Sequence, residues 1–136
     1  MKNIKWLWLV AFILLSGCAH VHEQKSLERL DAQKKLFMKA MRWKSYDVAA
    51  SVIRFENPAR RLAAIDGLNK ITITSYDLIA SIANYEEGTA EAQVLFGYIQ
   101  DNTGRVYQLK HAQHWWLDKE AKRWYLGSDM PEFKLN

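Results

Sequence analysis

The chain has 136 residues and carries 19 basic and 15 acidic side chains, four histidines and one cysteine, Cys18. This length is enough for one domain with a single core, and one cysteine excludes an internal disulfide framework. The sequence pI of about 9.2 does not indicate a nucleic-acid-binding protein, because Lys2 and Lys5 supply two of the four net positive charges and no long Lys/Arg block follows.

The N-terminal residues follow the pattern of an export signal. Lys2 and Lys5 precede an apolar run over residues 6–15. At about ten residues this run is too short for a bilayer core, which requires about 20, and it fits the hydrophobic region of a signal peptide. The next residues, Leu15-Ser16-Gly17-Cys18, resemble the L-[AS]-[GA]-C lipobox of bacterial lipoproteins at all four positions. The resemblance implies cleavage of the signal peptide 1–17, a diacylglyceryl thioether on Cys18 and acylation of the new amino group, for example by palmitate. An ordinary signal peptide or membrane anchor with an incidental cysteine is the alternative.

Residue 19 and the segment after it indicate where the domain would lie. In Gram-negative lipoproteins an aspartate after the lipidated cysteine usually marks inner-membrane retention. This position is Ala19, so the resemblance implies the outer membrane, with the domain facing the periplasm. Residues 18–26 are predicted to form a polar tether of at most about 28 Å, which holds the domain close to the membrane. His20 and His22 could ligate a metal, but solvent-exposed side chains are the favoured interpretation.

A long helix is predicted to follow the tether. Ser26 is the expected N-cap of a helix over residues 27–43. Its apolar stripe consists of Leu27, Leu30, Phe37 and Met41. Its other side carries Lys34, Lys35 and Lys39. We favour a core helix with a solvated basic face over a helix that contacts anionic head groups.

Two shorter helices are predicted next. Ser45 caps a helix over residues 46–54, and Asp47 in its first turn is favourable beside the positive end of the helix dipole. Asn57-Pro58 has the composition of a helix start and predicts a third helix that ends near residues 67–69. The apolar stripe of this third helix would consist of Leu62, Ile65 and Leu68.

From residue 70 onward the sequence predicts an antiparallel sheet. Strands are expected over residues 71–85, 91–100, 105–117 and 123–127, separated by turn signals at residues 86–89, 101–104 and 118–122. Both alternating sets of side chains in the strand 91–100 are largely apolar, which predicts a central strand covered on both faces. The chain is therefore predicted to form a single α+β domain over residues 27–136, with N-terminal helices packed on a curved sheet.

Segments of this domain resemble the nuclear transport factor 2-like superfamily. Residues 43–50 (WKSYDVAA) are similar to its acidic, alanine-rich second helix, and residues 112–115 (AQHW) with 123–126 (RWYL) are similar to its paired final strands. The resemblance covers about residues 27–133 and implies a sheet that wraps the helices into a cone. Some relatives are isomerases or dehydratases, with an inward base and a hydrogen-bond donor. The candidate bases here are Asp47, Asp77 and His111, and the candidate donors are Tyr46, Tyr76 and Tyr98.

The strand 105–117 predicts which side chains line the inside of the cone. One of its faces has no lysine and carries Tyr107, Leu109, His111, Gln113, Trp115 and Leu117, so we assign this face inward. His111 and Gln113 would then be polar groups in an apolar concavity, which is typical of a small-ligand site. Tyr76, Tyr98 and Trp115 complete this predicted pocket. Alternatively, His111 and Gln113 are core residues satisfied by tyrosine hydroxyls or backbone groups. His111 and His114 face opposite ways and cannot share a metal ion.

These patterns favour a non-catalytic protein without a cofactor. The sequence contains no nucleophile elbow, phosphate loop or zinc spacing, and its one thiol is assigned to the anchor. We expect a membrane-anchored envelope lipoprotein that binds a small apolar ligand in the cone, or that acts as an accessory of an envelope protein assembly through its sheet face or exposed aromatics such as Trp116. An isomerase or dehydratase with an acid–base pair in the cone is the alternative.

Overall fold

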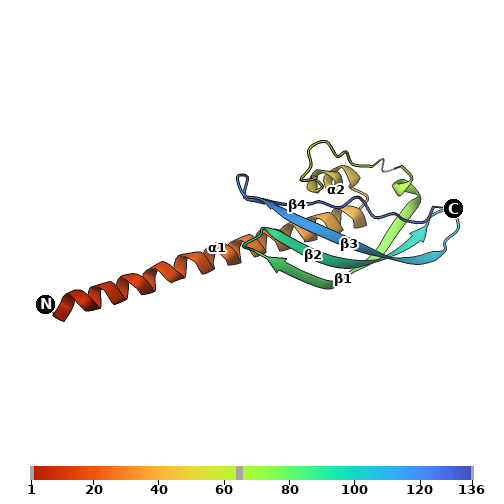
Figure 1. Ribbon diagram of the computed structural model, residues 1–136. Helices are drawn as coiled ribbons and strands as arrows, with labels where there is room; N and C mark the ends of the chain where they lie inside the picture. The colour runs from red at the N-terminus through yellow and green to blue at the C-terminus, as the bar shows by residue number, and fades with distance from the viewer. Residues whose placement is uncertain (1, 64–65, 136) are drawn as a thin grey trace.

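The computed structural model is a helical layer packed on one antiparallel sheet (Figure 1). It describes the backbone of residues 2–63 and 66–135, and the side chains of this part from Cys18 onward. Its elements are α1 (Lys2–Arg42), α2 (Tyr46–Val52), the short 3₁₀ helix η1 (Leu68–Lys70), β1 (Ile71–Asn84), β2 (Thr89–Gln100), β3 (Val106–Asp118) and β4 (Arg123–Leu126). The strands follow the order β1-β2-β3-β4, each antiparallel to its neighbour. The predicted α+β class is confirmed.

The helix α1 lies along one face of the sheet, which is here called the inner face (Figure 1). Its buried side chains include Ser26, Leu30, Lys34, Phe37 and Met41, which recur at intervals of three or four residues. This is the spacing of one helix face. The predicted apolar stripe is therefore confirmed at its three buried members, Leu30, Phe37 and Met41.

The beginning of α1 differs from the prediction. Residues 18–26, expected to form a tether, are helical, and Ser26 lies inside the helix rather than at its N-cap. Ser26 is buried because the Trp124 indole packs on it: the Nε1–H group donates to the Ser26 carbonyl at 3.0 Å and to its hydroxyl at 3.1 Å. Lys34, expected on the solvated face, is buried and donates to the Ser81 hydroxyl of β1 at 2.7 Å.

The segment between α1 and the sheet contains one α-helix in its described residues, where two were predicted. Ser45 stands at the N-cap of α2, as expected. The predicted third helix is wrong: the Asn57 side-chain oxygen accepts from the backbone amide two residues later at 3.0 Å, which makes an Asx turn. Ile53 pairs with Leu126 of β4 in a parallel bridge, and this draws the chain into an extended path. Ile65, part of the predicted third stripe, lies outside the described residues.

The sheet follows the predicted meander closely. The turns after β1 and β2 contain Gly88 (φ 68°) and Gly104 (φ 67°), and this left-handed backbone favours glycine. The central position of β2 is confirmed. Its predicted coverage on both faces is wrong in its first half, where Glu91 and Gln93 are exposed on the outer face because α1 covers only the inner one.

Large aromatic side chains fill the space between α1 and the sheet. Phe37, Phe96, Trp115 and Trp124 each have no solvent exposure. Burial of one such side chain stabilises the fold by about 2–3 kcal/mol. The inside of the predicted cone is therefore a packed core over these residues.

The C-terminal segment 127–135 closes the end of the inner face that lies farthest from the N-terminus (Figure 1). The ring of Phe133 packs edge-on against Phe96 and Tyr98, with centroid distances of 5.9 and 4.8 Å. The Lys134 amide donates to the Tyr98 hydroxyl at 3.0 Å. No role for this segment was predicted from the sequence, and it belongs to the core.

Candidate functional site

The inner face of β3 carries a continuous chain of side-chain hydrogen bonds. The Trp115 indole donates to Oε1 of Gln113 at 3.1 Å, and the Gln113 amide donates to Nδ1 of His111 at 3.2 Å. His111 then donates through Nε2 to the Asp129 carbonyl at 3.0 Å. The three side chains alternate along the strand and so share one face. Their inward orientation agrees with the prediction.

The partners determine the protonation of this chain. The Asp129 carbonyl only accepts, so Nε2 of His111 carries the hydrogen, and the Trp115 indole only donates, so Oε1 of Gln113 faces it. Burial lowers the pKa of His111, and the hydrogen bond to Asp129 offsets part of this effect. His111 is therefore neutral at pH 7, with both ring nitrogens engaged. This arrangement corresponds to the alternative of satisfied core residues, with their partners on β3 and in the C-terminal segment.

The two tyrosines of the predicted pocket lie in different surroundings. Tyr98 is buried on β2, where its ring stacks on Tyr107 at 5.5 Å. Tyr76 is 37 % exposed on β1 and lines a hollow beside α1 together with Lys34 and Met38. The structure therefore brings Tyr98 into the core that contains Gln113 and Trp115, whereas Tyr76 stands at the sheet edge.

The remaining candidates for acid–base chemistry do not meet. Asp47 is exposed on α2, and Asp77 lies opposite Leu95 on the outer face of β1. The Tyr46 hydroxyl donates to the Leu68 carbonyl at 2.7 Å, and its pKa is raised by burial and, less, by the charge of Asp101. None of these three groups lies on the inner face beside His111.

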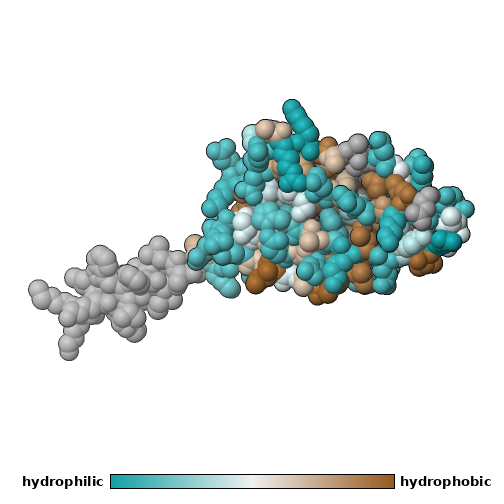
Figure 2. Space-filling view, turned by 45° about the vertical axis from the view of Figure 1, so that its right-hand side comes forward, coloured by the Kyte–Doolittle hydropathy of each residue, from teal (hydrophilic) through white to brown (hydrophobic). Residues whose placement is uncertain are grey.

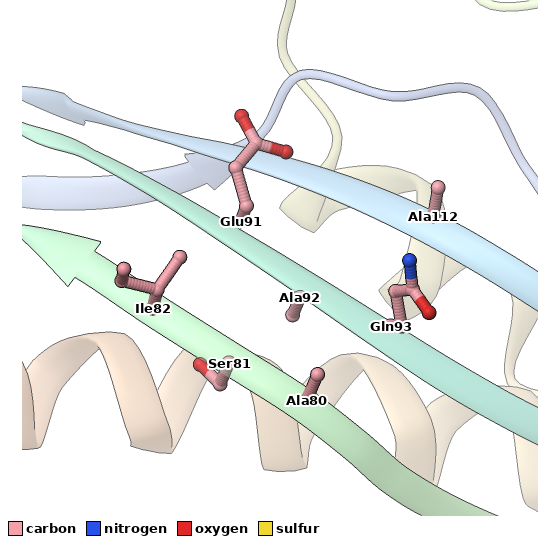
Figure 3. Close-up of a pocket in the computed structure, with 7 residues that line it drawn as sticks. All are labelled: Ala80, Ser81, Ile82, Glu91, Ala92, Gln93 and Ala112. Carbon is pink, nitrogen blue, oxygen red and sulfur yellow. The ribbon is translucent and has the colours of Figure 1, made fainter.

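The hollows of this domain lie on its surface. None of five such hollows among the described residues is lined by His111, Gln113, Tyr98 or Trp115. One of about 280 Å³ lies on the outer face. There Ala80 of β1 and Ala112 of β3 flank Gln93, and Ile82 and Glu91 border one end (Figure 3). Alanines on both sides of a longer side chain leave the space open.

His114 has the opposite environment to His111. On the outer face it forms a short contact through Nδ1 with Glu91, and Nε2 lies 3.3 Å from Glu56. Its pKa is raised, first by the hydrogen bond to Glu91 and then by the other carboxylate, against a partial effect of burial. The described residues contain no group of three or more His, Cys, Asp or Glu side chains arranged for a metal ion.

Trp116, predicted as an exposed aromatic, is half-buried. Its indole donates to the Arg54 carbonyl at 2.6 Å, and its ring lies 5.5 Å from that of Tyr125. The Arg54 guanidinium covers both rings, at 5.8 and 5.2 Å from their centroids. Trp116 is therefore less exposed than predicted, and less of its ring is available to a partner.

The strand β1 forms an open edge of the sheet. The Arg42 guanidinium donates to the Ile73 carbonyl near its start, and every residue from Thr74 to Asn84 is exposed. Leu78, Ile79 and Ile82 are 47, 49 and 73 % exposed. The sequence predicted this strand but we did not predict its position at the edge of the sheet. The order of elements indicates that position, because the first strand of a meander lies at an edge.

Cys18 is an exposed free thiol in α1. The side chains of residues 1–17, which include the charged and apolar parts of the predicted signal and three lipobox positions, lie outside the described residues. Among the residues that the structure describes, no helix combines the length and apolar character of a membrane span.

Comparisons of this chain with protein-family models, with curated proteins and with solved structures found no match. The fold class is therefore assigned from the structure, without a family.

Proposed function

We propose that this chain is a bacterial lipoprotein whose acylated Cys18 anchors it in the outer membrane, and whose domain binds an extended segment of another envelope protein along β1. The anchor is supported by the match of Leu15-Ser16-Gly17-Cys18 to the lipobox, by the charged and apolar residues before it, and by the exposed free thiol. Two or three acyl chains anchor a protein stably, whereas one binds only marginally.

The open edge of β1 is the observation that carries the binding proposal. An edge strand offers a row of backbone N–H and C=O groups that an incoming strand can pair with. Such edges are commonly protected by short length, proline, several charges or β-bulges. β1 has 14 residues, no proline and one charged side chain, Asp77. Its register shifts at two places, between Ile73 and Ser75 and between Leu78 and Ala80, and the residues after the second shift pair regularly up to Asn84. Hydrophobic side chains along the lower margin of the domain, where β1 lies, agree with this proposal (Figure 2).

The packed interior favours this function over a ligand-binding cone. A small apolar ligand would have to displace buried aromatics such as Trp115 or Phe133. Catalysis by His111 would require a free ring nitrogen, and both are engaged. The proposed role is therefore non-catalytic and needs no cofactor. Two helices on an antiparallel sheet remain compatible with a nuclear transport factor 2-like domain, although one predicted helix is lost.

Site-specific photo-cross-linking in intact cells tests the binding proposal. A photoreactive amino acid is placed at Leu78 or Ile82 on the β1 edge, and at Gln108, which is exposed on β3, as a control. The two edge positions are four residues apart in β1 and pair with residues three positions apart in β2, so their cross-links are expected about three or four residues apart in one segment of a partner, as in an added strand. Cross-links from Gln108 to the same segment, scattered sites, or adducts between two copies of this chain would contradict the proposal.

A further inference from the structure

A second hollow, of about 450 Å³, lies at the end of the domain nearest Cys18. Its walls come from residues 22–29 of α1, the turn after β1 and the turn after β3. These three segments are distant in sequence and meet where α1 enters the domain. Hydrophilic side chains gather at this junction (Figure 2).

The lining of this hollow is basic. Four cations line it, Lys25, Arg29, Lys119 and Lys122, and Glu86 is the one carboxylate among its lining residues. None of the four cations forms an ion pair with a carboxylate that the structure describes. Unpaired like charges around one space are relieved by a bound anion.

The backbone at Lys122 adds an independent observation. Its φ of 52° lies in the left-handed region, where glycine or asparagine is favoured over a long side chain. A lysine in this conformation costs backbone energy that a glycine would not. Lys122 shares this conformation with Lys44, which lies outside the hollow, and at Lys122 a glycine would remove the charge without straining the turn.

The distance from Cys18 identifies the source of the anion. A helix rises 1.5 Å per residue, so Lys25 and Arg29 lie only about 10 and 16 Å along α1 from Cys18. We propose that this hollow binds the phosphate of an anionic phospholipid head group in the membrane that holds the anchor. This inference rests on the proposed lipidation of Cys18. Arginine binds phosphate oxygens in a bidentate manner, and lysines add point charges.

Lipid nanodiscs test this binding with the lipidated protein. Backbone amide NMR shifts of residues 22–29 and 119–122 are compared in phosphatidylcholine, in phosphatidylcholine with phosphatidylglycerol, and in phosphatidylcholine with added inorganic phosphate. We expect shifts with phosphatidylglycerol that decrease with salt, because screening weakens exposed charge contacts. One basic residue near an anionic surface changes affinity about fivefold.

Two double variants with the same loss of charge test whether the hollow causes the shifts with phosphatidylglycerol. Lys25→Gln with Lys122→Gly removes two lining charges, and the glycine suits the left-handed backbone, so the fold is retained. This variant is expected to require at least about tenfold more phosphatidylglycerol for the same shift. Lys70→Gln with Lys110→Gln removes the same charge from exposed positions outside the hollow, and is expected to behave as the unmodified protein.

The possible outcomes distinguish a failure of the head-group site from a failure of the lipid anchor. Equal responses of the two variants, or no shift with phosphatidylglycerol, would overturn the head-group site. Saturation by inorganic phosphate in neutral nanodiscs, without a further shift from phosphatidylglycerol, would assign the hollow to free anions and also overturn it. An intact mass without lipid on Cys18 would contradict the anchor and, with it, the head-group site. A lipidated protein that shows no response to phosphatidylglycerol would contradict the head-group site alone.

Discussion

The side-chain amide of Gln113 donates to Nδ1 of His111 across 3.2 Å, between two side chains that face the core from alternate positions of β3. Its carbonyl oxygen accepts from Trp115 on the other side. One amide therefore satisfies an acceptor and a donor that burial would otherwise leave unpaired. The polar residues of the inner face therefore belong to the packed core, and the groups free to bind a partner lie on the surface.

Replacement of Gln113 by leucine is expected to destabilise the fold by about 2–6 kcal/mol. Leucine has a similar volume but leaves the Trp115 N–H and a nitrogen of His111 without partners, at about 1–3 kcal/mol each. Urea denaturation measures the free energy of unfolding. Gln108→Leu on the exposed face of β3 is the control, with an expected change within about 0.5 kcal/mol. Equal effects of the two substitutions would contradict the hydrogen-bonded chain.

The two histidines of β3 are expected to titrate on opposite sides of about pH 6.5, the ordinary pKa of histidine. The pKa of His111 is lowered mainly by burial, and that of His114 is raised mainly by the hydrogen bond to Glu91. NMR of the imidazole Cε1–H protons measures both. An inflection of His111 above that of His114 would show that the assignment of these environments is wrong.

The same pKa shifts predict the pH dependence of stability. Neutral His111 contributes stability above the unfolded-state pKa of about 6.5, and this is lost as pH falls below it. Protonated His114 contributes stability below about pH 6.5, and this is lost as pH rises through its folded pKa. His114→Gln removes the second effect, so we expect its stability loss to be smaller at high pH than at low pH. A uniform loss between about pH 5.5 and 8 would contradict the proposed role of its charge.

Trp124 is expected to hold the middle of α1 against the sheet through its indole N–H. Trp124→Phe removes both hydrogen bonds to Ser26 and part of the buried ring, for a loss of about 2–4 kcal/mol. Trp43, which is 71 % exposed, is the matched control. Thermal unfolding of Trp124→Phe and Trp43→Phe should differ clearly, and similar midpoints would show that α1 is held elsewhere.

Phe133→Ala tests whether the C-terminal segment belongs to the core. Removal of this buried ring, which packs on Phe96 and Tyr98, is expected to cost about 3–5 kcal/mol. Leu135→Ala, at a position 43 % exposed, is expected to cost about 0.5 kcal/mol or less. If both variants unfold like the unmodified protein, the segment does not close the core.

The strands were the most predictable part of the fold from sequence. Alternation along β3 placed His111 and Gln113 inward correctly, because one buried face leaves a pattern with a period of two residues. Local patterns could not predict the burial of Ser26 or Lys34. Their partners, Trp124 and Ser81, lie 98 and 47 residues away along the chain.

The candidate site was less predictable than the fold, because it too depends on contacts between residues that are distant in sequence. Residue types indicated a polar concavity, but whether it is open depends on how the segment 127–135 packs across it. The basic hollow was missed because Lys25 and Lys122 lie in distant segments, each with few charges of its own. The third helix failed because its start signal, Asn57-Pro58, also suits an Asx turn.

The intact mass of the protein extracted from bacterial membranes tests the anchor most directly. We predict a chain that begins at Cys18, retains 119 of the 136 residues after loss of residues 1–17, and carries a diacylglyceryl group and an amide-linked acyl chain on Cys18. Cys18→Ser should abolish lipid labelling and leave a larger unprocessed form. A chain that still contains residues 1–17 with an unmodified Cys18 thiol, or normal processing and membrane retention of the serine variant, would contradict the proposed lipoprotein.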